Sequence, residues 1–451
     1  MDNQKLVQKK IIGHNRVFEE PELKNLKLFY FLCAFLLITD IIMPQYFGIR
    51  LGYDITCTRL ANILIFLYML LNPKIFVHFF HTIMQCNMAI PMFSYLFVCA
   101  YTMVLRIDIN ALFLVLLEML TLCMLIYGIR YVIGYERAIK WLICASYFFG
   151  VLGLVDFVRG KSLMLQLLST LPSAVANSYR SGHYRIMGPC GHALAYGLFL
   201  ILLIAIACVD LKRNEVYLFR RPVLIILLYI NVFLTGSRST LGIAILEAFL
   251  IILFSKVSNI KKTLLLLSAI IAALGFFLLI FHNTNIGQYI LMQIASVIDQ
   301  VFGTEYAALF GAETTRLTNS EEYRKALPLI FSLDWLNPIV GRGVSRSFGA
   351  EINGFFIQSI DNYYVSQYIK YAYPGMIAYI LFIATILGTM IAGIRRYNSA
   401  LVKMLFVGTV CYYINLWWLD ALQTLKYEYI VIAVFYAYML GVKEEKKGRC
   451  N

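Results

Sequence analysis

Charge is scarce in this sequence. Asp, Glu, Lys and Arg make up only 14% of its 451 residues, whereas 61% of the residues are hydrophobic. A soluble protein of this size would need far more polar surface, so that class is excluded. Apolar runs of roughly 16–22 residues recur about a dozen times and are too long and too uniform for barrel strands. The composition therefore predicts an all-α polytopic membrane protein with about 12 transmembrane helices.

Motifs for metals, disulfides and nucleotides are also missing. The ten cysteines include no CxxC pair, and only Cys190 has a histidine close by in the sequence, His192. We therefore expect neither a zinc site nor a structural disulfide. No GxxxxGK[ST] motif is present, and the Gly341-x-Gly343 pattern lacks the third glycine of a dinucleotide fingerprint. These absences predict a protein that uses no metal and no nucleotide cofactor.

Positive charge is unevenly distributed along the chain, which has a net charge of +14. With both termini in the cytoplasm, twelve spans place 24 Lys and Arg residues inside and 15 outside, and short basic joints mark the cytoplasmic side. The expected organisation is a cytoplasmic tail (1–27), nine spans (28–281), an external loop (282–371), three further spans (372–441) and a second cytoplasmic tail (442–451).

The external positive residues are mostly arginines, eleven of them against four lysines. Solvation alone does not require arginine, but bidentate binding of phosphate or carboxylate does, because the guanidinium fork matches those oxygens. We therefore expect an arginine-lined anion site on the outer face. The alternative is that the bias reflects composition alone.

Two short external segments carry candidate residues for such a site. Arg185 stands at the mouth of the sixth span, in a loop that also holds Arg180, His183 and His192, and Ser237-Arg238 forms the turn between spans seven and eight. Each arginine has a plain structural explanation as well. Arg185 is then a solvated loop residue, and Arg238 reaches up to the lipid headgroups.

The long external loop carries a third arginine, Arg324. It lies on a candidate helix, Asn319–Leu333, whose start resembles a capping box formed by Asn319 and Glu322. We expect Pro328 to kink or shorten this helix. The alternative is an ordinary amphipathic helix that lies on the membrane with Arg324 in water.

The order of these segments resembles the bacterial O-antigen polymerase and O-antigen ligase family. The resemblance covers about residues 140–395 and rests on an ordered set of motifs: Arg185-x-x-Gly188 before a span, Ser237-Arg238 between two spans, then Arg324, Asn337–Gly343, Asp361-Asn362-Tyr363 and Tyr373-Pro374-Gly375. It implies an integral-membrane glycosyltransferase on the outer face of the bacterial plasma (inner) membrane. The implied donor is an oligosaccharide on undecaprenyl pyrophosphate, with neither a nucleotide sugar nor ATP.

Within this family, polymerases transfer the growing glycan to the next lipid-linked repeat unit, and ligases transfer the finished glycan to lipid A-core. Ligases typically carry a His before the Asn of the motif at the end of the long loop, where this chain has Asp361. This departure favours a polymerase. Membrane lipid and a chain-length regulator are further candidate partners, and nucleic acid is not.

The implied reaction assigns roles to the candidates. The leaving lipid pyrophosphate gains negative charge, which a clamp of Arg185, Arg238 and Arg324 would stabilise. Asp361 is the candidate base or orients a sugar, although it could simply cap a turn. The expected substrate-binding residues are Arg180, His183, His192, Ser237, Gly341, Gly343, Asn362 and Tyr363, and the two histidines are alternative bases.

Three acidic residues inside predicted spans, Asp40, Glu118 and Glu247, keep a different function open. A charge at the centre of a span costs about 2.5–3.5 kcal/mol on insertion scales, so such residues suggest a function or a paired partner. A transporter of lipid-linked oligosaccharides would use them. Against this alternative, the sequence shows no inverted repeat of broken helices and has a long external loop that a minimal carrier does not need.

Overall fold

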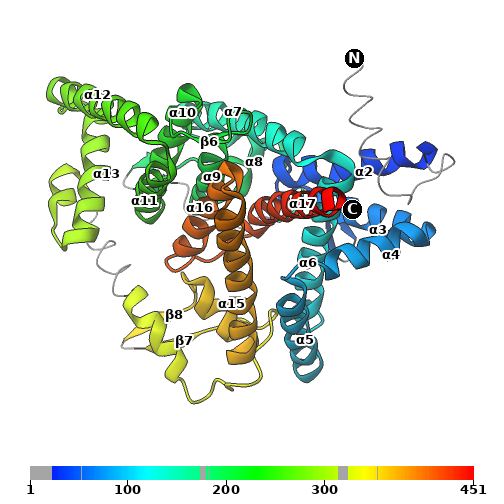
Figure 1. Cartoon of the computed structure of the whole chain (residues 1–451). Coiled ribbons are helices and arrows are strands. Elements are labelled where there is room, and N and C mark those ends of the chain that lie inside the picture. Colours follow the sequence, from blue (N-terminus) through cyan, green and yellow to red (C-terminus); the bar gives the residue numbers. More distant parts are fainter. Residues whose placement is uncertain are drawn as a thin grey trace.

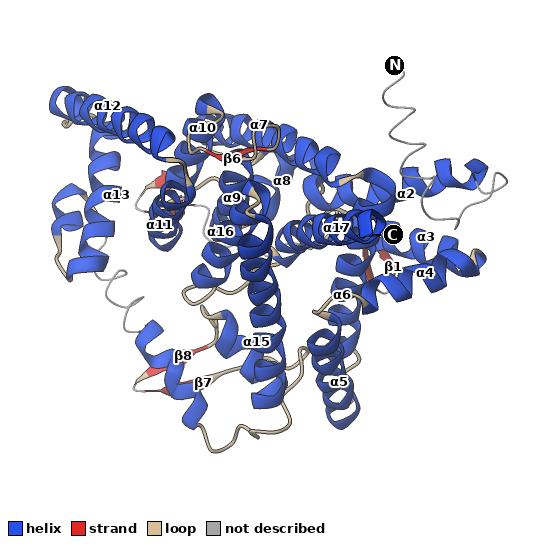
Figure 2. Cartoon of the chain, viewed as in Figure 1, coloured by secondary structure: helices blue, strands red, loops and turns tan. Residues whose placement is uncertain are grey.

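The computed structural model describes residues 23–51, 53–172, 179–180, 182–312, 323–352 and 354–450. This part of the chain is predominantly helical, and its strands occur only as two-stranded hairpins (Figure 2). The expected all-α class is therefore confirmed. The N-terminal tail, except for residues 23–27, lies outside the described residues, as do Arg316, Asn319 and Glu322.

Six helices in the described residues are long and apolar enough to cross a membrane. A helix rises about 1.5 Å per residue, so about 20 residues cross the hydrocarbon core. The six confirm the membrane-protein class. They are α5 (Ala89–Arg106), α6 (Asn110–Gly128, extended to Ile133 by a π-helical turn), α7 (Tyr135–Arg159), α12 (Val257–Phe281), α15 (Tyr363–Tyr397) and α17 (Leu425–Cys450).

The other expected spans also coincide with helices, but some of these are short. The pair α3 (Cys57–Leu71) and α4 (Pro73–Met84) meets at 115° and counts as one broken span at most. Because several of the rest fall below the length that crosses a bilayer unaided, the number twelve stays a prediction. The remaining helices, of which all but α2 have fewer than 18 residues, are α2 (Leu23–Ile42), α9 (Ala193–Ala207), α10 (Pro222–Leu234), α11 (Arg238–Phe254) and α16 (Ala400–Asn415).

Helix α9 forms the centre of the core. It is apolar on every side and nearly all of its residues are buried, packed against α7, α10, α11, α16 and α17. Helix α12 carries Lys261 and Lys262 near its start but is apolar beyond Thr263, and its membrane-length window has no buried residue. A helix that is hydrophobic all round must avoid water. Helix α9 does so inside the protein, whereas the apolar part of α12 is left uncovered by the described residues.

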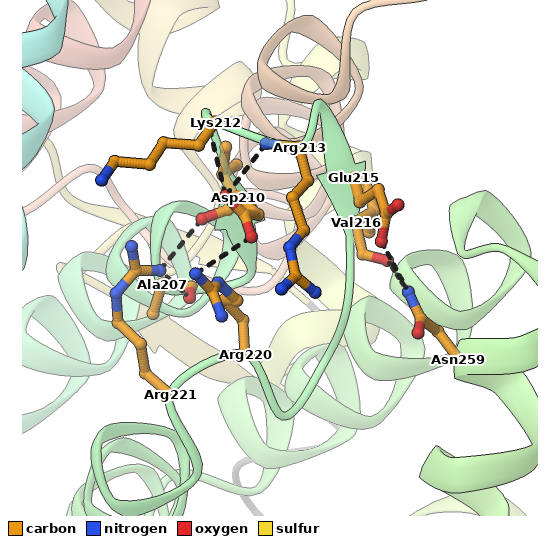
Figure 3. A network of polar contacts seen from close by, with 10 residues as sticks. Ala207, Asp210, Lys212, Arg213, Glu215, Val216, Arg220, Arg221 and Asn259 are labelled. Carbon is orange, nitrogen blue, oxygen red and sulfur yellow. Dashed lines mark hydrogen bonds and ion pairs between the residues drawn. The ribbon is translucent and has the colours of Figure 1, made fainter.

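The central helix α9 ends in a basic joint that folds into a defined hairpin of β5 (Val209–Asp210) and β6 (Glu215–Val216). Figure 3 shows Asp210 accepting the backbone N–H groups of Lys212 and Arg213 at 3.1 and 3.2 Å and pairing with Arg220 at 3.0 Å. Arg221 donates to the carbonyl of Ala207 at 2.6 Å, at the end of α9 (Figure 3). The positive side chain thus satisfies carbonyl groups that a helix end leaves free.

The segment expected to form the external loop contains one long helix and several short elements. Helix α13 (Asn285–Phe302) begins at Thr284, whose side chain accepts the N–H of Gly287 at 3.1 Å, and ends at Gly303 in a left-handed conformation. It lies beside α11 and below α12 (Figure 1). The short elements are the 3-10 turns η4 (Tyr306–Phe310) and η5 (Leu327–Ser332) and the hairpin of β7 (Ala350–Ile352) and β8 (Phe355–Ile357).

The expected helix around Arg324 is shorter than its sequence suggests. Residues 323–326 are helical, and the 3-10 turn η5 then begins at Leu327 with Pro328 in its first turn. The proline ring is incompatible with a continuing α-helix, which explains the change. The capping box at the start of this helix, Asn319 and Glu322, lies outside the described residues.

Helix α15 joins the external loop to the membrane region. Its first residues, Tyr363–Tyr371, precede a kink at Ala372 (φ 55°), and Pro374 follows the kink. In Figure 1, α15 runs between α16 and α5, and both contacts are close. The end of the loop and the expected tenth span therefore belong to one kinked helix.

Candidate functional site

Arg185 packs against the turn that joins α10 to α11. It follows the hairpin of β3 (Tyr179–Arg180) and β4 (His183–Tyr184), and its Nε donates to the carbonyl of Thr235 at 2.7 Å. The side chain is only 7% exposed. Gly236, with φ 59°, lies directly against it: an added Cβ would stand 3.3 Å from Arg185 Nε. The structure thus brings together two of the predicted segments, the Arg185 loop and the Ser237-Arg238 turn.

Ser237 and Arg238 form the start of α11. The Ser237 hydroxyl accepts the N–H of Thr240 at 3.4 Å and lies 2.8 Å from the Thr240 hydroxyl. Arg238 is the first residue of the helix. A helix N-terminus carries partial positive charge and exposes N–H groups, so the two arginines stand where the backbone also favours an anion.

Helix α13 packs against α11 and lies next to His183. Its residue Tyr289 is buried, with its ring centroid 4.3 Å from that of His183 and 5.7 Å from that of Phe233. Burial raises the pKa of the Tyr289 phenol, and the charge of Arg185 opposes that rise. Burial also acts to raise the pKa of Asp299, but hydrogen bonds and the charge of Arg238 lower it overall. Helix α13 therefore reaches both arginines.

The two histidines of this region are neutral near pH 7. Burial, and then the charge of Arg185, lowers the pKa of His192 from 6.5 to about 4. Its Nδ1 accepts the N–H of Leu194 at 3.1 Å, so His192 caps α9 and carries its proton on Nε2. Burial also lowers the pKa of His183. Arg180 belongs to β3, and its side chain lies outside what the structure describes.

Arg324 and Asp361 form a second group. Arg324 Nη2 lies 3.9 Å from Asp361 Oδ2, and Ser359 Oγ lies 3.4 Å from the other carboxylate oxygen. Burial raises the pKa of Asp361, while the charge of Arg324 opposes this rise. A carboxylate whose pKa is raised towards neutrality is better suited to proton abstraction than an ordinary one.

The neighbours of Asp361 are built into the fold. The Asn362 side chain accepts the N–H of Val365 at 3.0 Å, which caps α15, and donates to the carbonyl of Trp417 at 2.9 Å. The backbone N–H of Tyr363 donates to the carbonyl of Leu416 at 3.0 Å, and its side chain is buried. These two predicted substrate-binding residues therefore fix the position of Asp361 against the end of α16.

The Asn337–Gly343 turn has the shape that its glycines allow. Asn337 Oδ1 accepts the N–H groups of Ile339 and Val340 at 2.8 and 3.0 Å. An added Cβ on Gly341 would stand 2.1 Å from the carbonyl oxygen of Lys370. Gly343 has φ 84°, a conformation that side chains rarely adopt.

Two residues that hold this turn were missed by the sequence analysis, Arg106 and Asp108. Arg106 donates to the carbonyls of Gly341 and Val340 at 2.6 and 2.9 Å. Asp108 Oδ2 accepts the N–H groups of Val344 and Ser345 at 2.7 and 2.9 Å. Burial acts to raise the pKa of Asp108, but these hydrogen bonds outweigh it and lower the pKa. The available signal was an Arg and an Asp inside one short external joint.

The predicted residues thus fall into two groups. One holds Arg185, Ser237 and Arg238 under α13, and the other pairs Arg324 with Asp361 at the start of α15. The ion pair described for Arg324 runs to Asp361, so the three-arginine clamp stays a prediction.

These observations define the class of the protein as a helical membrane protein with an arginine-bearing region under a loop helix. No protein-family model matches the sequence, and no curated protein matches it.

Proposed function

We propose that this protein polymerises lipid-linked oligosaccharide repeat units at the outer face of a bacterial plasma membrane. The observation that carries the proposal is the contact of Arg185 with the turn that bears Ser237 and Arg238, next to α13. Arginines from separate loops thereby flank one helix N-terminus. This arrangement suits a substrate whose charged part is a pyrophosphate.

The reaction needs few protein groups. A hydroxyl of the acceptor sugar attacks the anomeric carbon of the donor, the bond from that carbon to the pyrophosphate oxygen breaks, and its electron pair leaves with the lipid pyrophosphate. The proton of the hydroxyl passes to the Asp361 carboxylate. Arg185 and Arg238 stabilise the charge that develops on the leaving group, more in the transition state than before it.

Twelve membrane crossings with both termini inside are part of this proposal. The support is that contacts between joints link segments assigned to the same side. On the proposed outer side these contacts join Tyr46 to Thr170, Arg106 to Gly341, Arg185 to Thr235 and Asn362 to Trp417. On the proposed cytoplasmic side they join Arg130 to Glu444, Asn214 to Ala400 and Glu215 to Lys256.

Transport of a lipid-linked oligosaccharide is a second candidate function, favoured by buried acids. Glu247 in α11 is fully buried, and neither of its carboxyl oxygens has a hydrogen-bond partner among the described residues. Asp40 in α2 is also buried and accepts a hydrogen bond from Thr58 at 3.3 Å. Such residues inside spans often belong to ion or proton paths.

A deletion strain tests the proposal against its alternatives. Loss of a polymerase leaves surface glycolipids with a single repeat unit. Loss of an O-antigen ligase leaves none, and loss of a transporter traps the repeat units on the inner face. An unchanged distribution of polymer lengths in the deletion strain would rule the polymerase out.

A further inference from the structure

An apolar groove runs along the surface where α5 and α15 pack against each other. Its volume is about 790 Å³, and its lining includes Ser94, Phe97, Pro374, Ile377, Leu381 and Thr385. On α15 the lining runs from Pro374 to Thr385, which is about 16 Å along the helix axis. A space of this length and composition matches a hydrocarbon chain better than a compact solute.

The groove opens onto the outside of the helix bundle. Phe97 is 70% exposed and Leu381 is 54% exposed, although both belong to helices long and apolar enough to cross a membrane. Lipid chains can therefore enter the groove sideways from the bilayer, without passing through water.

Both walls of the groove hold the Asn337–Gly343 turn at one end. From α5, the Tyr101 hydroxyl donates to the carbonyl of Ile339 at 2.8 Å. From α15, the N–H of Tyr373, next to the groove residue Pro374, donates to the carbonyl of Pro338 at 3.2 Å. The turn therefore closes the end of the groove that faces the external loop.

This closed end is basic. Arg106, Arg342 and Arg346 gather there: Arg106 binds the turn, Arg342 lies within it, and Arg346 Nη2 lies 3.4 Å from the Arg106 carbonyl. Arg346 is exposed. The carboxylate that contacts this segment, Asp108, accepts hydrogen bonds from Val344 and Ser345. The groove thus combines an apolar channel with a cationic end, the complement of a long-chain lipid with an anionic headgroup.

We propose that this groove binds the acceptor, a polyisoprenyl pyrophosphate lipid, with its chain between α5 and α15 and its pyrophosphate at Arg342 and Arg346. The inference rests on the proposed function, in which donor and acceptor are both lipid-linked and need separate sites. Asp361 lies two residues before the start of α15, whereas the groove residue Pro374 lies eleven residues into this helix, beyond the kink at Ala372. That separation leaves room for the sugars of the acceptor between its pyrophosphate and the base.

Binding of undecaprenyl pyrophosphate without sugars tests the groove directly. The full-length protein is placed in nanodiscs of phosphatidylethanolamine and phosphatidylglycerol, and bound lipid is counted by native mass spectrometry. Ser94→Trp fills the groove from an exposed position, and Arg346→Gln removes a charge from its end. Val104→Trp, exposed on α5 outside the groove, and Arg50→Gln, an exposed external arginine, are the matched controls.

The expected result is two lipid pyrophosphates on the wild-type protein and on both controls. Ser94→Trp and Arg346→Gln should weaken one of the two sites about tenfold, which corresponds to about 1.4 kcal/mol. Equal binding by the groove variants and the controls would overturn the inference. Displacement of the second lipid by phosphatidylglycerol at equal concentration would overturn it too, because the groove would then hold bulk lipid.

A polymerisation assay separates this inference from the proposed function. Ser94→Trp should raise the KM for the acceptor about tenfold with little change in kcat, because the groove is remote from the reacting atoms. A wild-type KM in Ser94→Trp would overturn the acceptor site and leave the polymerase standing. No polymer from the wild-type protein, despite groove binding that Ser94→Trp weakens, would overturn the proposed function instead.

Discussion

Arg106, the last residue of α5, donates from Nε to the carbonyl oxygen of Gly341 at 2.6 Å, across 235 positions of sequence. With Asp108 it ties the joint between α5 and α6 to the turn of the external loop. A charged hydrogen bond of this kind contributes about 1.5–3 kcal/mol. The turn is consequently held in a fixed position against the end of α5, and its exact shape matters for what lies beside it.

Gly343→Ala should destabilise the protein and lower polymer formation. Gly343 has φ 84°, and an added Cβ would stand 2.4 Å from Asp108 Oδ2. The backbone strain costs about 1 kcal/mol and the displaced carboxylate adds about 1–3 kcal/mol. Gly354→Ala is the control, because Gly354 has φ 78° but open space around it. Thermal unfolding of both variants measures the difference, and equal losses would contradict the account.

The acidic limb of the pH–rate profile should depend on Arg324. Burial raises the pKa of Asp361 and the charge of Arg324 lowers it. In the proposed reaction Asp361 acts as the base in its carboxylate form, so the rate should fall as the pH drops through this pKa. Arg324→Gln removes the opposing charge and should move the acidic limb of kcat/KM to higher pH.

Asp361→Asn should reduce the rate by about 10²–10⁴-fold, the usual contribution of a general base. Glu351→Gln, an exposed acid on β7, is the control and should keep the wild-type profile. If Asp361→Asn retains the wild-type rate and profile, Asp361 is not the base.

His192 should make stability depend on pH. The folded protein holds this imidazole neutral down to about pH 4, whereas the unfolded chain binds a proton near pH 6.5. The contribution of the neutral His192 to the free energy of unfolding is therefore complete above pH 6.5, and it is lost as the pH falls towards 4. His192→Asn keeps a side chain that can cap α9 but does not titrate. The melting temperature of this variant should fall less between pH 7 and pH 5 than that of the wild type, and identical slopes would contradict the assignment.

Arg185→Lys keeps the charge but loses the guanidinium fork. We expect polymer formation to fall by about a hundredfold, the usual effect of removing one donor that stabilises developing charge. Arg159→Lys at the exposed end of α7 is the matched control. Polymer length on gels, compared at equal protein level, measures the effect. Wild-type polymer from Arg185→Lys would make Arg185 a purely structural residue.

The sequence predicted the helices well because each long apolar run marks a segment that must avoid water. It could not tell the buried α9 from α12, since each contains a long uniformly apolar run, and burial depends on which neighbours a helix finds. The kink at Ala372 and the hairpin β7–β8 were likewise not predicted. Both depend on contacts between the external loop and the helices, which local pattern does not contain.

For the candidate site too, the sequence could predict the residues but not the contacts between distant segments. Arg185 and Arg238 could be found because each stands at the end of an apolar run, where topology alone places them on one side. The hydrogen bond from Arg185 to the Thr235 carbonyl, in the turn just before Arg238, depends on how α10 and α11 pack, which the sequence does not show. Arg106 and Asp108 were missed because their partners lie more than 230 residues further along the chain.

Reconstitution of the purified protein tests the central claim most directly. Nanodiscs that contain the protein and one undecaprenyl-pyrophosphate-linked repeat unit, without nucleotide sugar or ATP, should produce a ladder of lengthened lipid-linked glycans. The ladder should be lost in the double variant Arg185→Lys with Asp361→Asn. A substrate that stays at a single repeat unit with the folded wild-type protein would contradict the account.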